Sequence, residues 1–314
     1  MKVAFLDTVH PALEEGLTKN GFDCVDLTKS TKETIEQLAS EFEGIVIRSR
    51  FPMDKQFLSK AKNLKFIARS GAGMENIDIS FCEERGITLF SAPEGNRNAV
   101  AEHAVAMILS LFNKLNKADK EVRAGIWDRE GNRGIELDGK IVGIIGYGNN
   151  GSAFANKLQG FDVDVLAYDK YKSEYSQGRI KAAEWQELLH RSDIISLHIP
   201  ENEETIGIID STFIAKMKKP FYLINLSRGK IVNTEDLVEG INSGKVLGAC
   251  LDVLEYEKTS FENMFVDKPI PTAFQALIQS NKVILSPHVG GWTQESYKKL
   301  STVLLSKILA KFKK

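Results

Sequence analysis

Polar side chains directly follow three apolar runs in the second half of the sequence. Arg228 comes after FYLIN, Glu255 and Glu257 come after LGACLDV, and His288 comes after KVILS. In an open sheet of parallel strands the ligand crevice lies beyond the carboxyl ends of the strands, so these groups can share one crevice. A guanidinium can bind a carboxylate, an imidazolium can protonate a developing alkoxide, and an acid can hold that imidazolium in place. The set predicts hydride transfer to a 2-oxo acid, and the alternative is three surface residues on unrelated loops.

A glycine-rich segment offers a site for the hydride carrier. Residues 141–155 contain a GxGxxG pattern between an apolar run and a helical pattern, formed by Gly146, Gly148 and Gly151. Glycine lets the backbone and a helix N-terminus approach a pyrophosphate closely. Asp169 ends the next apolar run, where a carboxylate accepts hydrogen bonds from ribose hydroxyls and repels a 2'-phosphate. The segment predicts NAD rather than NADP. A glycine turn without a ligand is the alternative, and Lys170 and Lys172 leave a phosphate contact open.

Two series of short apolar runs, separated by helical patterns, must position these residues. The first series is VAFL, FDCVDL, GIVIRS, KFIARS and ITLFS, between residues 3 and 91. The second begins at Lys140 and comprises KIVGIIG, VDVLAYD, DIISLHIP, FYLINLS, LGACLDV and KVILSPH. Apolar runs that alternate with helices are typical of parallel sheets covered by helices. The sequence predicts an α/β protein with two doubly wound parallel sheets.

Two helices set the expected domain boundaries. A long helix between the two series is indicated by its apolar spacing, with Asn98 as its N-cap and Val100, Ala104, Met107, Ile108 and Leu111 on one face. A final helix contains Tyr297, Leu300, Leu304 and Ile308, and we expect it to pack back onto the first domain. Residues 1–97 and 290–314 are therefore predicted to form a discontinuous, flavodoxin-like substrate-binding domain, and residues 98–289 a Rossmann-type NAD-binding domain.

The composition excludes several classes of protein. The chain has 314 residues, with 41 Lys and Arg against 42 Asp and Glu, and a net charge of -1 argues against a nucleic-acid binder. No apolar run is long enough to cross a membrane, so no membrane partner is expected. Three scattered cysteines, Cys24, Cys82 and Cys250, predict neither a disulfide framework nor a metal site. The opening residues lack a signal-peptide pattern, which favours the cytoplasm.

Seven stretches, in their order and spacing, resemble the D-isomer-specific 2-hydroxyacid dehydrogenases, and within them the branch that includes D-3-phosphoglycerate dehydrogenase. They are SGAGMENID, GNRNAVAEH, ELDGKIVGIIGYGNNG, SDIISLHIP, NLSRGKIV, GACLDVLEYE and LSPHVGGWT, which together extend over nearly the whole chain. The resemblance implies an NAD-dependent oxidoreductase that acts on a small 2-hydroxy or 2-oxo acid. It also implies a homodimer joined through the cofactor domain.

The resemblance implies a role for particular residues. Arg228, Glu257 and His288 are the implied catalytic set. The implied cofactor contacts are Gly146, Gly148, Asn149, Asn150, Gly151, Asp169, His198, Pro200, Thr205 and Asp252. Two of them have an alternative: Asp252 could only organise its loop, and His198 could be a hydrogen-bonded core histidine. The pair Glu102 and His103 is implied to be structural or interdomain.

The substrate is left open by the sequence. Backbone N–H groups of Ser70, Gly71, Ala72 and Gly73 are implied to cradle the substrate carboxylate. Arg48 and Arg69 follow strands of the first domain and could anchor a phosphate, which favours D-3-phosphoglycerate and serine biosynthesis. Both arginines could also be ordinary surface residues. Reduction of hydroxypyruvate or glyoxylate is the next alternative, followed by D-lactate oxidation. An NAD-sensing scaffold, similar to dehydrogenase-like corepressors, is an alternative of another class.

One segment departs from the family pattern. Lys258 follows Glu257, where the family usually has a proline, and this puts the local loop geometry in doubt. The stretch 258–280 is also longer than in compact members. It could cover the active site, contact a partner subunit or pack on the surface.

Overall fold

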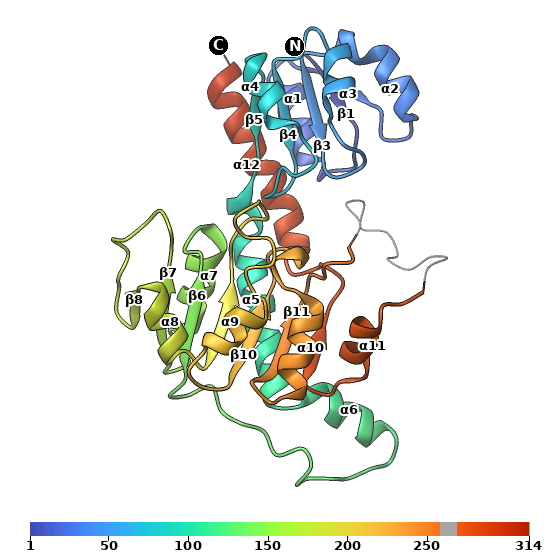
Figure 1. Cartoon of the computed structure of the whole chain (residues 1–314). Coiled ribbons are helices and arrows are strands. Elements are labelled where there is room, and N and C mark those ends of the chain that lie inside the picture. Colours follow the sequence, from blue (N-terminus) through green and yellow to red (C-terminus); the bar gives the residue numbers. More distant parts are fainter. Residues whose placement is uncertain (258–268, 314) are drawn as a thin grey trace. The chain divides into compact units, whose positions relative to one another are not determined.

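A computed structural model describes residues 1–257 and 269–313, and the chain divides into two compact units. The first unit comprises Met1–Arg97 and Trp292–Lys314, and the second comprises Asn98–Gly291. Each unit contains one parallel sheet with helices on both faces, as the sequence predicts (Figure 1). The chain leaves the second unit at Gly291, whereas the sequence placed that boundary at residues 289 and 290.

The first unit has a five-stranded sheet in the order β2-β1-β3-β4-β5, and every recorded strand pair is parallel. This is the flavodoxin-like order predicted for the first domain. The strands are β1 (Lys2–Phe5), β2 (Asp23–Asp26), β3 (Gly44–Ile47), β4 (Phe66–Arg69) and β5 (Thr88–Phe90). The helices are α1 (Ala12–Lys19), α2 (Lys32–Leu38), the 3-10 turn η1 (Ala39–Glu41), α3 (Lys55–Lys60), α4 (Ile79–Glu84) and α12 (Gln294–Phe312).

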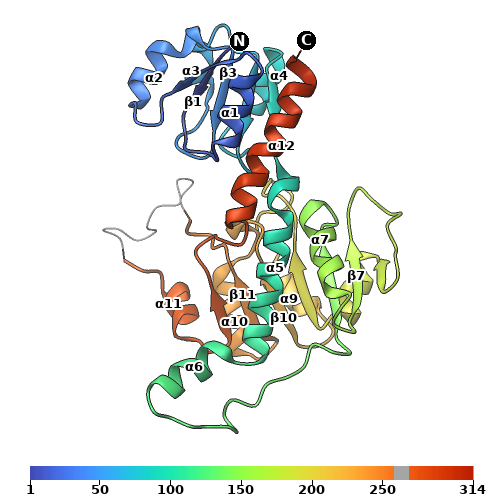
Figure 2. The ribbon, with the colours of Figure 1, turned by 180° about the vertical axis from the view of Figure 1, so that it is seen from behind.

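Side chains that alternate along these strands form two cores, one on each face of the sheet. Helices α1 and α12 cover one face (Figure 2), where Leu13 and Leu17 pack in one cluster with Leu300, Leu304 and Ile308. Helices α2, α3 and α4 contribute to the cluster on the other face. The final helix therefore completes the core of the first unit.

The second unit has a seven-stranded parallel sheet in the order β12-β11-β10-β9-β6-β7-β8. The strands are β6 (Ile141–Ile145), β7 (Asp164–Tyr168), β8 (Ile180–Ala182), β9 (Ile194–Leu197), β10 (Phe221–Asn225), β11 (Val246–Leu251) and β12 (Val283–Leu285). The order reverses between β6 and β9, which gives the topology of a Rossmann fold with one additional strand. Strand β8 was not predicted from the sequence, because this edge strand is only three residues long and is not an apolar run.

Helices cover both faces of this second sheet. Helices α5 (Pro93–Phe112) and α7 (Asn149–Leu158) pack in the cluster on one face. The other face is covered by α8 (Trp185–Arg191), α9 (Ser211–Lys216), α10 (Thr234–Asn242) and α11 (Thr272–Gln279). A 3-10 turn, η2 (Gly229–Ile231), follows β10 directly.

The long helix α5 begins earlier than predicted. Its first residue is Pro93, so Asn98 lies inside the helix and the prediction that Asn98 caps it is wrong. Proline is favoured at the first helical position because its φ is already helical and it has no N–H to satisfy. The Asn98 amide instead donates a hydrogen bond of 2.9 Å to Glu102, one turn further along. The predicted apolar face is correct, since Val100, Ala104 and Met107 are buried.

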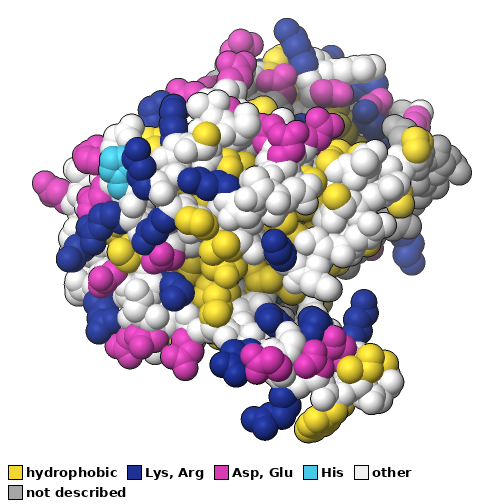
Figure 3. Space-filling view, turned by 60° about the horizontal axis from the view of Figure 1, so that its bottom comes forward, with side chains coloured by type: hydrophobic (Ala, Val, Ile, Leu, Met, Phe, Trp, Pro, Cys, Tyr) yellow, Lys and Arg dark blue, Asp and Glu magenta, His cyan; other side chains and the backbone are white. Residues whose placement is uncertain are grey.

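Helix α6 (Leu115–Arg123) and the chain that follows it expose apolar side chains (Figure 3). The exposed fractions are 55% for Leu115, 52% for Val122, 51% for Ile126 and 79% for Trp127. Lys114 and Lys117 donate to the carbonyl oxygen of Gly131, so the chain beyond α6 folds back against the helix. No helix among the described residues is long and apolar enough to cross a membrane.

Candidate active site and cofactor-binding loop

His288 and Glu257 form a close pair beyond the carboxyl ends of β12 and β11. The Nδ1 atom of His288 lies 2.6 Å from Oε2 of Glu257, and both side chains are about three-quarters buried. Glu257 is fixed in turn, because its other oxygen accepts a hydrogen bond from the backbone N–H of Leu254. A carboxylate on Nδ1 fixes the tautomer and the orientation of the ring, so that Nε2 is the atom that can exchange a proton with a ligand.

The loop that carries His288 is wrapped around the carboxylate of Asp252, which is only 2% exposed. Its Oδ1 atom accepts hydrogen bonds from Ser286 Oγ at 2.5 Å and from the N–H of Val289 at 2.9 Å. Its Oδ2 atom accepts the N–H of Gly290 at 2.7 Å. The geometry therefore gives Asp252 the loop-organising role that the sequence left as an alternative, and a contact with the cofactor remains a prediction.

Arg228 lies at the same edge of the sheet. Strands β10, β11 and β12 are neighbours with Asn225, Leu251 and Leu285 in register, and Arg228, Glu257 and His288 follow these three residues. Because adjacent strands are about 4.8 Å apart, β10 and β12 are separated by roughly 10 Å, which long side chains can bridge. The Nη1 atom of Arg228 donates to the carbonyl oxygen of Ser227 at 2.6 Å.

Gly229 brings the loops after β10 and β11 together. A Cβ atom at this position would lie 2.0 Å from the carbonyl carbon of Leu254. Only glycine permits this approach of two backbones, and it joins the loop of Arg228 to the loop of Glu257. The three residues predicted as the catalytic set thus come from adjoining loops of one unit.

The glycine loop joins β6 to α7, and its three glycines have different surroundings. Gly146 has a φ of 93°, and a Cβ there would lie 2.6 Å from the carbonyl oxygen of His198. At Gly151 the added atom would lie 2.0 Å from the carbonyl oxygen of Gly146. At Gly148 it would meet nothing within 4 Å. The first and third glycines are therefore required by packing, whereas the second presents bare backbone to open space, as pyrophosphate binding needs.

Asp169 lies at the end of β7 and faces this loop. Its Oδ2 atom accepts the N–H of Tyr147 at 2.8 Å, and its Oδ1 atom accepts the N–H of Tyr171 at 2.9 Å. These bonds fix the carboxylate beside the glycine turn, and each oxygen retains a lone pair for a ribose hydroxyl. Lys170 forms a 2.6 Å ion pair with Glu204, which raises the pKa of Lys170.

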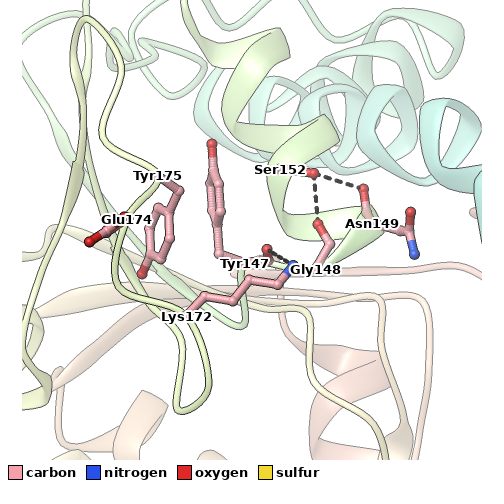
Figure 4. A pocket seen from close by; sticks show the side chains of 7 residues that line it. All are labelled: Tyr147, Gly148, Asn149, Ser152, Lys172, Glu174 and Tyr175. Carbon is pink, nitrogen blue, oxygen red and sulfur yellow. Dashed lines mark hydrogen bonds between the residues drawn. The ribbon is translucent and has the colours of Figure 1, made fainter.

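A cavity of about 390 Å³ opens at the N-terminus of α7 (Figure 4). Ser152 closes the first turn of the helix by donating to the carbonyl oxygen of Gly148 at 2.7 Å. The rings of Tyr147 and Tyr175 stack with their centres 4.2 Å apart, and Lys172 Nζ lies 3.4 Å from the carbonyl oxygen of Tyr147. The lining residues are Tyr147, Gly148, Asn149, Ser152, Lys172, Glu174 and Tyr175. The open backbone at Gly148 and the fixed carboxylate at Asp169 fit a dinucleotide.

Three further predicted cofactor residues, His198, Pro200 and Thr205, lie after β9. His198 Nε2 is 2.9 Å from Ser196 Oγ, and burial lowers the pKa of His198 to about 3. The ring is therefore neutral near pH 7, in accord with the alternative that His198 is a core histidine. Thr205 Oγ1 donates to the carbonyl oxygen of Pro200 at 2.6 Å and closes the turn. Contacts of His198, Pro200 and Thr205 with a cofactor remain predictions, as does one with Asn150, whose Oδ1 atom is buried without a partner among the described residues.

The first unit places Arg48 and Arg69 at one edge of its sheet. Arg69 pairs in register with Ile47, and Arg48 follows Ile47 directly. The Arg48 guanidinium lies 4.2 Å from the centre of the Trp292 ring, and burial lowers its pKa. The Arg69 guanidinium covers Gly71, where a Cβ would lie 1.4 Å from Nη1. Both arginines are therefore held by packing rather than free on the surface.

The backbone N–H groups of the segment from Ser70 to Gly73 differ in their hydrogen bonding. The N–H of Ser70 donates to Ile47 O at 2.8 Å, and the N–H of Gly71 donates to Arg69 O at 2.9 Å. Among the described residues, no hydrogen-bond acceptor is recorded for the N–H groups of Ala72 and Gly73. Two consecutive N–H groups of this kind suit an anion such as a carboxylate.

Sequence reasoning missed how the loop of His288 is supported. Ser286 was not singled out, and His103 was assigned only a structural or interdomain role, yet His103 Nε2 lies 2.9 Å from Ser286 Oγ. The motif LSPH contained Ser286, but no sequence signal linked it to a helix far earlier in the chain. The first part of the predicted excursion 258–280, residues 258–268 including Lys258, lies outside the described residues. Its remainder contains α11, with Phe274 in the core.

Comparison with known proteins agrees with this geometry. Residues 105–290 match the model of the family described as D-isomer specific 2-hydroxyacid dehydrogenase, NAD binding domain. The chain is 35% identical over 311 residues to a D-3-phosphoglycerate dehydrogenase of Archaeoglobus fulgidus, covering 98% of this chain and 57% of the relative. It is 33% identical to a hydroxypyruvate reductase of Thermotoga maritima, covering 88% of this chain and 87% of the relative. The chain belongs to the D-isomer-specific 2-hydroxyacid dehydrogenase family.

A solved structure gives the same result. The structure of a D-lactate dehydrogenase from Aquifex aeolicus, complexed with NAD and lactic acid, superimposes with a TM-score of 0.82 at 28% identity. It covers 99% of this chain, and this chain covers 96% of it. The predicted family, the fold class and the cofactor NAD are thereby confirmed. The chain spans about half the length of the D-3-phosphoglycerate dehydrogenases that it matches.

Proposed function

We propose that this chain is an NAD-dependent D-2-hydroxyacid dehydrogenase. The observation that carries the proposal is the 2.6 Å pair of His288 and Glu257 at the sheet edge that also bears Arg228. When bound, NAD would supply or accept the hydride at the C2 carbon of the substrate. Arg228 binds the substrate carboxylate and polarises the carbonyl, and His288 donates a proton to the C2 oxygen during reduction. Glu257 holds the protonated ring and stabilises its charge. In the direction of oxidation His288 acts as the base.

Gly146, Gly148, Gly151 and the first turn of α7 would hold the pyrophosphate of NAD, and Asp169 would hold the adenine ribose. The support is that an added Cβ at Gly148 meets open space while Asp169 is fixed beside the loop. A phosphate on the ribose would meet the Asp169 carboxylate, so NADP is disfavoured.

The proposed substrate is D-3-phosphoglycerate. Arg48 and Arg69 share one sheet edge of the first unit, and the open N–H groups of Ala72 and Gly73 lie in the segment that follows Arg69. A substrate with a carboxylate and a phosphate needs two anion sites, whereas lactate needs one. This substrate would place the chain in serine biosynthesis. Hydroxypyruvate or glyoxylate reduction is the alternative, because the relative in Thermotoga maritima is named a hydroxypyruvate reductase.

The test is NADH oxidation by the full chain with phosphohydroxypyruvate, hydroxypyruvate, glyoxylate and pyruvate. The proposal expects the highest kcat/KM with phosphohydroxypyruvate. His288→Gln should lower kcat by roughly 10²- to 10⁴-fold, since proton transfer is lost, while the Kd for NADH stays unchanged. His190→Gln, on the exposed end of α8, is the matched control. If the chain binds NADH but reduces none of the 2-oxo acids, the result would contradict the proposed enzymatic function and favour the NAD-sensing scaffold.

The choice of substrate is tested at the two arginines. Arg48→Gln and Arg69→Gln should each lower kcat/KM for phosphohydroxypyruvate by roughly ten- to a hundredfold, the effect of one lost charge-assisted hydrogen bond. Hydroxypyruvate, which lacks the phosphate, is the internal control and should be affected far less. Equal losses with both substrates would mean that the arginines are structural.

We also propose a homodimer that works in the cytoplasm. The exposed apolar side chains of the α6 segment support a self-complementary interface, and the three free cysteines suit a reducing compartment. Sedimentation should show a dimer, and Trp127→Glu should give monomers. Ile278→Glu, at a side chain on α11 that is 53% exposed, should leave the dimer intact. A monomeric wild-type chain would contradict the interface.

A further inference from the structure

A polar network lies behind the loop that carries His288. The carboxylate of Asp252 is almost completely buried and receives hydrogen bonds from Ser286, Val289 and Gly290. The carbonyl oxygen of Asp252 also accepts the N–H of His288 at 2.8 Å. A buried carboxylate is tolerated only when its oxygens are satisfied, so the path of this loop is bound to the position of Asp252.

His103 extends this network to helix α5. Its Nε2 atom lies 2.9 Å from Ser286 Oγ and 3.7 Å from Asp252 Oδ1. The hydroxyl of Ser286 has one proton, which it donates to Asp252 over 2.5 Å. The Ser286 oxygen must therefore accept from His103, and this requires a proton on Nε2 of His103. The chain of donors runs from His103 through Ser286 to Asp252.

The backbone of the loop needs such support. His288 has a φ of 55°, in the left-handed region that costs energy for a residue other than glycine. A Cβ at Gly290 would lie 2.8 Å from Asp252 Oδ2 and 3.5 Å from Cδ2 of His103, so these groups pack closely around the loop. Contacts from outside the loop thus maintain a conformation that the loop would not favour alone.

We propose that His103 is a positioning residue for His288. By donating from Nε2 to Ser286, it orients the serine hydroxyl toward Asp252 and so holds segment 286–290 in the conformation that pairs His288 with Glu257. His103 itself does not touch the substrate in this proposal. The role rests on the proposed function, because it matters for turnover only if His288 exchanges the proton.

The test compares three variants of the full chain with wild type. His103→Leu removes the donor, whereas His103→Gln keeps an N–H at a similar reach. We expect His103→Leu to lower kcat about three- to tenfold, the effect of one lost hydrogen bond, and His103→Gln to recover most of it. The deuterium isotope effect on kcat with deuterated NADH should rise in His103→Leu because the chemical step slows. The Kd for NADH should not change. His190→Leu is the matched control and should behave as wild type in every measurement.

Ser286 provides an independent arm if His103→Leu does not fold. Ser286→Ala should give the same loss of kcat and the same rise in isotope effect, and Ser286→Thr, which keeps the hydroxyl, should not. In the double variant His103→Leu with Ser286→Ala the two effects should not add, because both substitutions break one chain of donors. Additive effects, a kcat of His103→Leu within twofold of wild type, or a parallel loss of NADH binding would overturn the proposal.

Failure of the proposed function can be told apart from failure of this role. If wild type reduces none of the 2-oxo acids, the proposed function fails, and the positioning role is then tested by NMR of the histidine rings. In wild type the His288 ring should give one sharp set of signals, and in His103→Leu it should give broadened or multiple signals. Identical His288 signals in the two proteins would overturn the positioning role.

Discussion

At the scale of single residues, His198 and His288, two of the partly buried histidines of the second unit, lie in different electrostatic environments. His288 has a carboxylate on Nδ1, whereas His198 contacts the hydroxyl of Ser196 and the Phe154 ring. Burial lowers the pKa of His198 to about 3 because the charged ring would lose water without gaining an anionic partner. The same type of side chain is thus paired with a carboxylate in one environment and kept neutral near pH 7 in the other.

This difference predicts a pH effect on stability. In the unfolded chain His198 binds a proton below about pH 6.5, whereas in the folded chain it binds a proton only below about pH 3. The contribution of His198 to stability is therefore complete above pH 6.5 and is lost as the pH falls toward 3. Between pH 7 and 4.5, wild type should lose about 1–3 kcal/mol of unfolding free energy relative to His198→Gln. Urea denaturation at the two pH values measures this loss. For His190→Gln, the difference in unfolding free energy from wild type should be the same at both pH values. The same result for His198→Gln would contradict the prediction.

The polar residues that follow three neighbouring strands could be predicted to lie at one sheet edge, whereas the residues that support their loops could not be predicted. Arg228, Glu257 and His288 stand out in the sequence because each polar side chain ends an apolar run. Ser286 and His103 do not, because their role depends on a contact between a loop and a helix far apart in the chain. The sequence also left Asp252 undecided, since only the structure shows how its oxygens are used.

At the scale of elements, the β6–α7 turn contains two glycines that packing requires and one, Gly148, for which we propose a role in NADH binding. Gly151→Ala would force a Cβ to within 2.0 Å of Gly146 O, so we expect a loss of about 1–3 kcal/mol of stability. Gly148→Ala adds a methyl group to open space and should leave the melting temperature unchanged while weakening NADH binding. Thermal denaturation and fluorescence titration with NADH test both. An equal drop in melting temperature in Gly151→Ala and Gly148→Ala would contradict this assignment. Wild-type NADH affinity in Gly148→Ala would contradict it as well.

Most elements followed from periodicity, and the exceptions have physical reasons. The apolar runs became strands because buried parallel strands are apolar on both faces. The edge strand β8 gave no such signal, because its Lys181 is exposed and only Ile180 is fully buried. The start of α5 was placed too late because Asn98 is a favourable cap residue, and the preference of Pro93 for the first helical position prevailed.

At the scale of the whole molecule, the two units have separate cores. Two hydrophobic clusters belong to the first unit, built from residues between 3 and 92 together with Leu300, Leu304 and Ile308. The other two clusters lie between Val100 and Val283. Because the apolar burial that stabilises each unit is its own, each can unfold as a cooperative unit.

This separation predicts how NADH stabilises the chain. The glycine loop, Asp169 and the matched NAD-binding family region all lie in the second unit. Ligand that binds only the folded second unit adds RT ln(1 + [L]/Kd) to its stability, about 2.7 kcal/mol at a hundred times Kd. Calorimetry should therefore resolve two transitions, of which NADH raises one and leaves the other in place. Arg48→Gln, in the first unit, should not change the NADH-dependent shift, whereas Gly148→Ala should reduce it. A single transition, or two that NADH raises equally, would show that the two cores unfold as one.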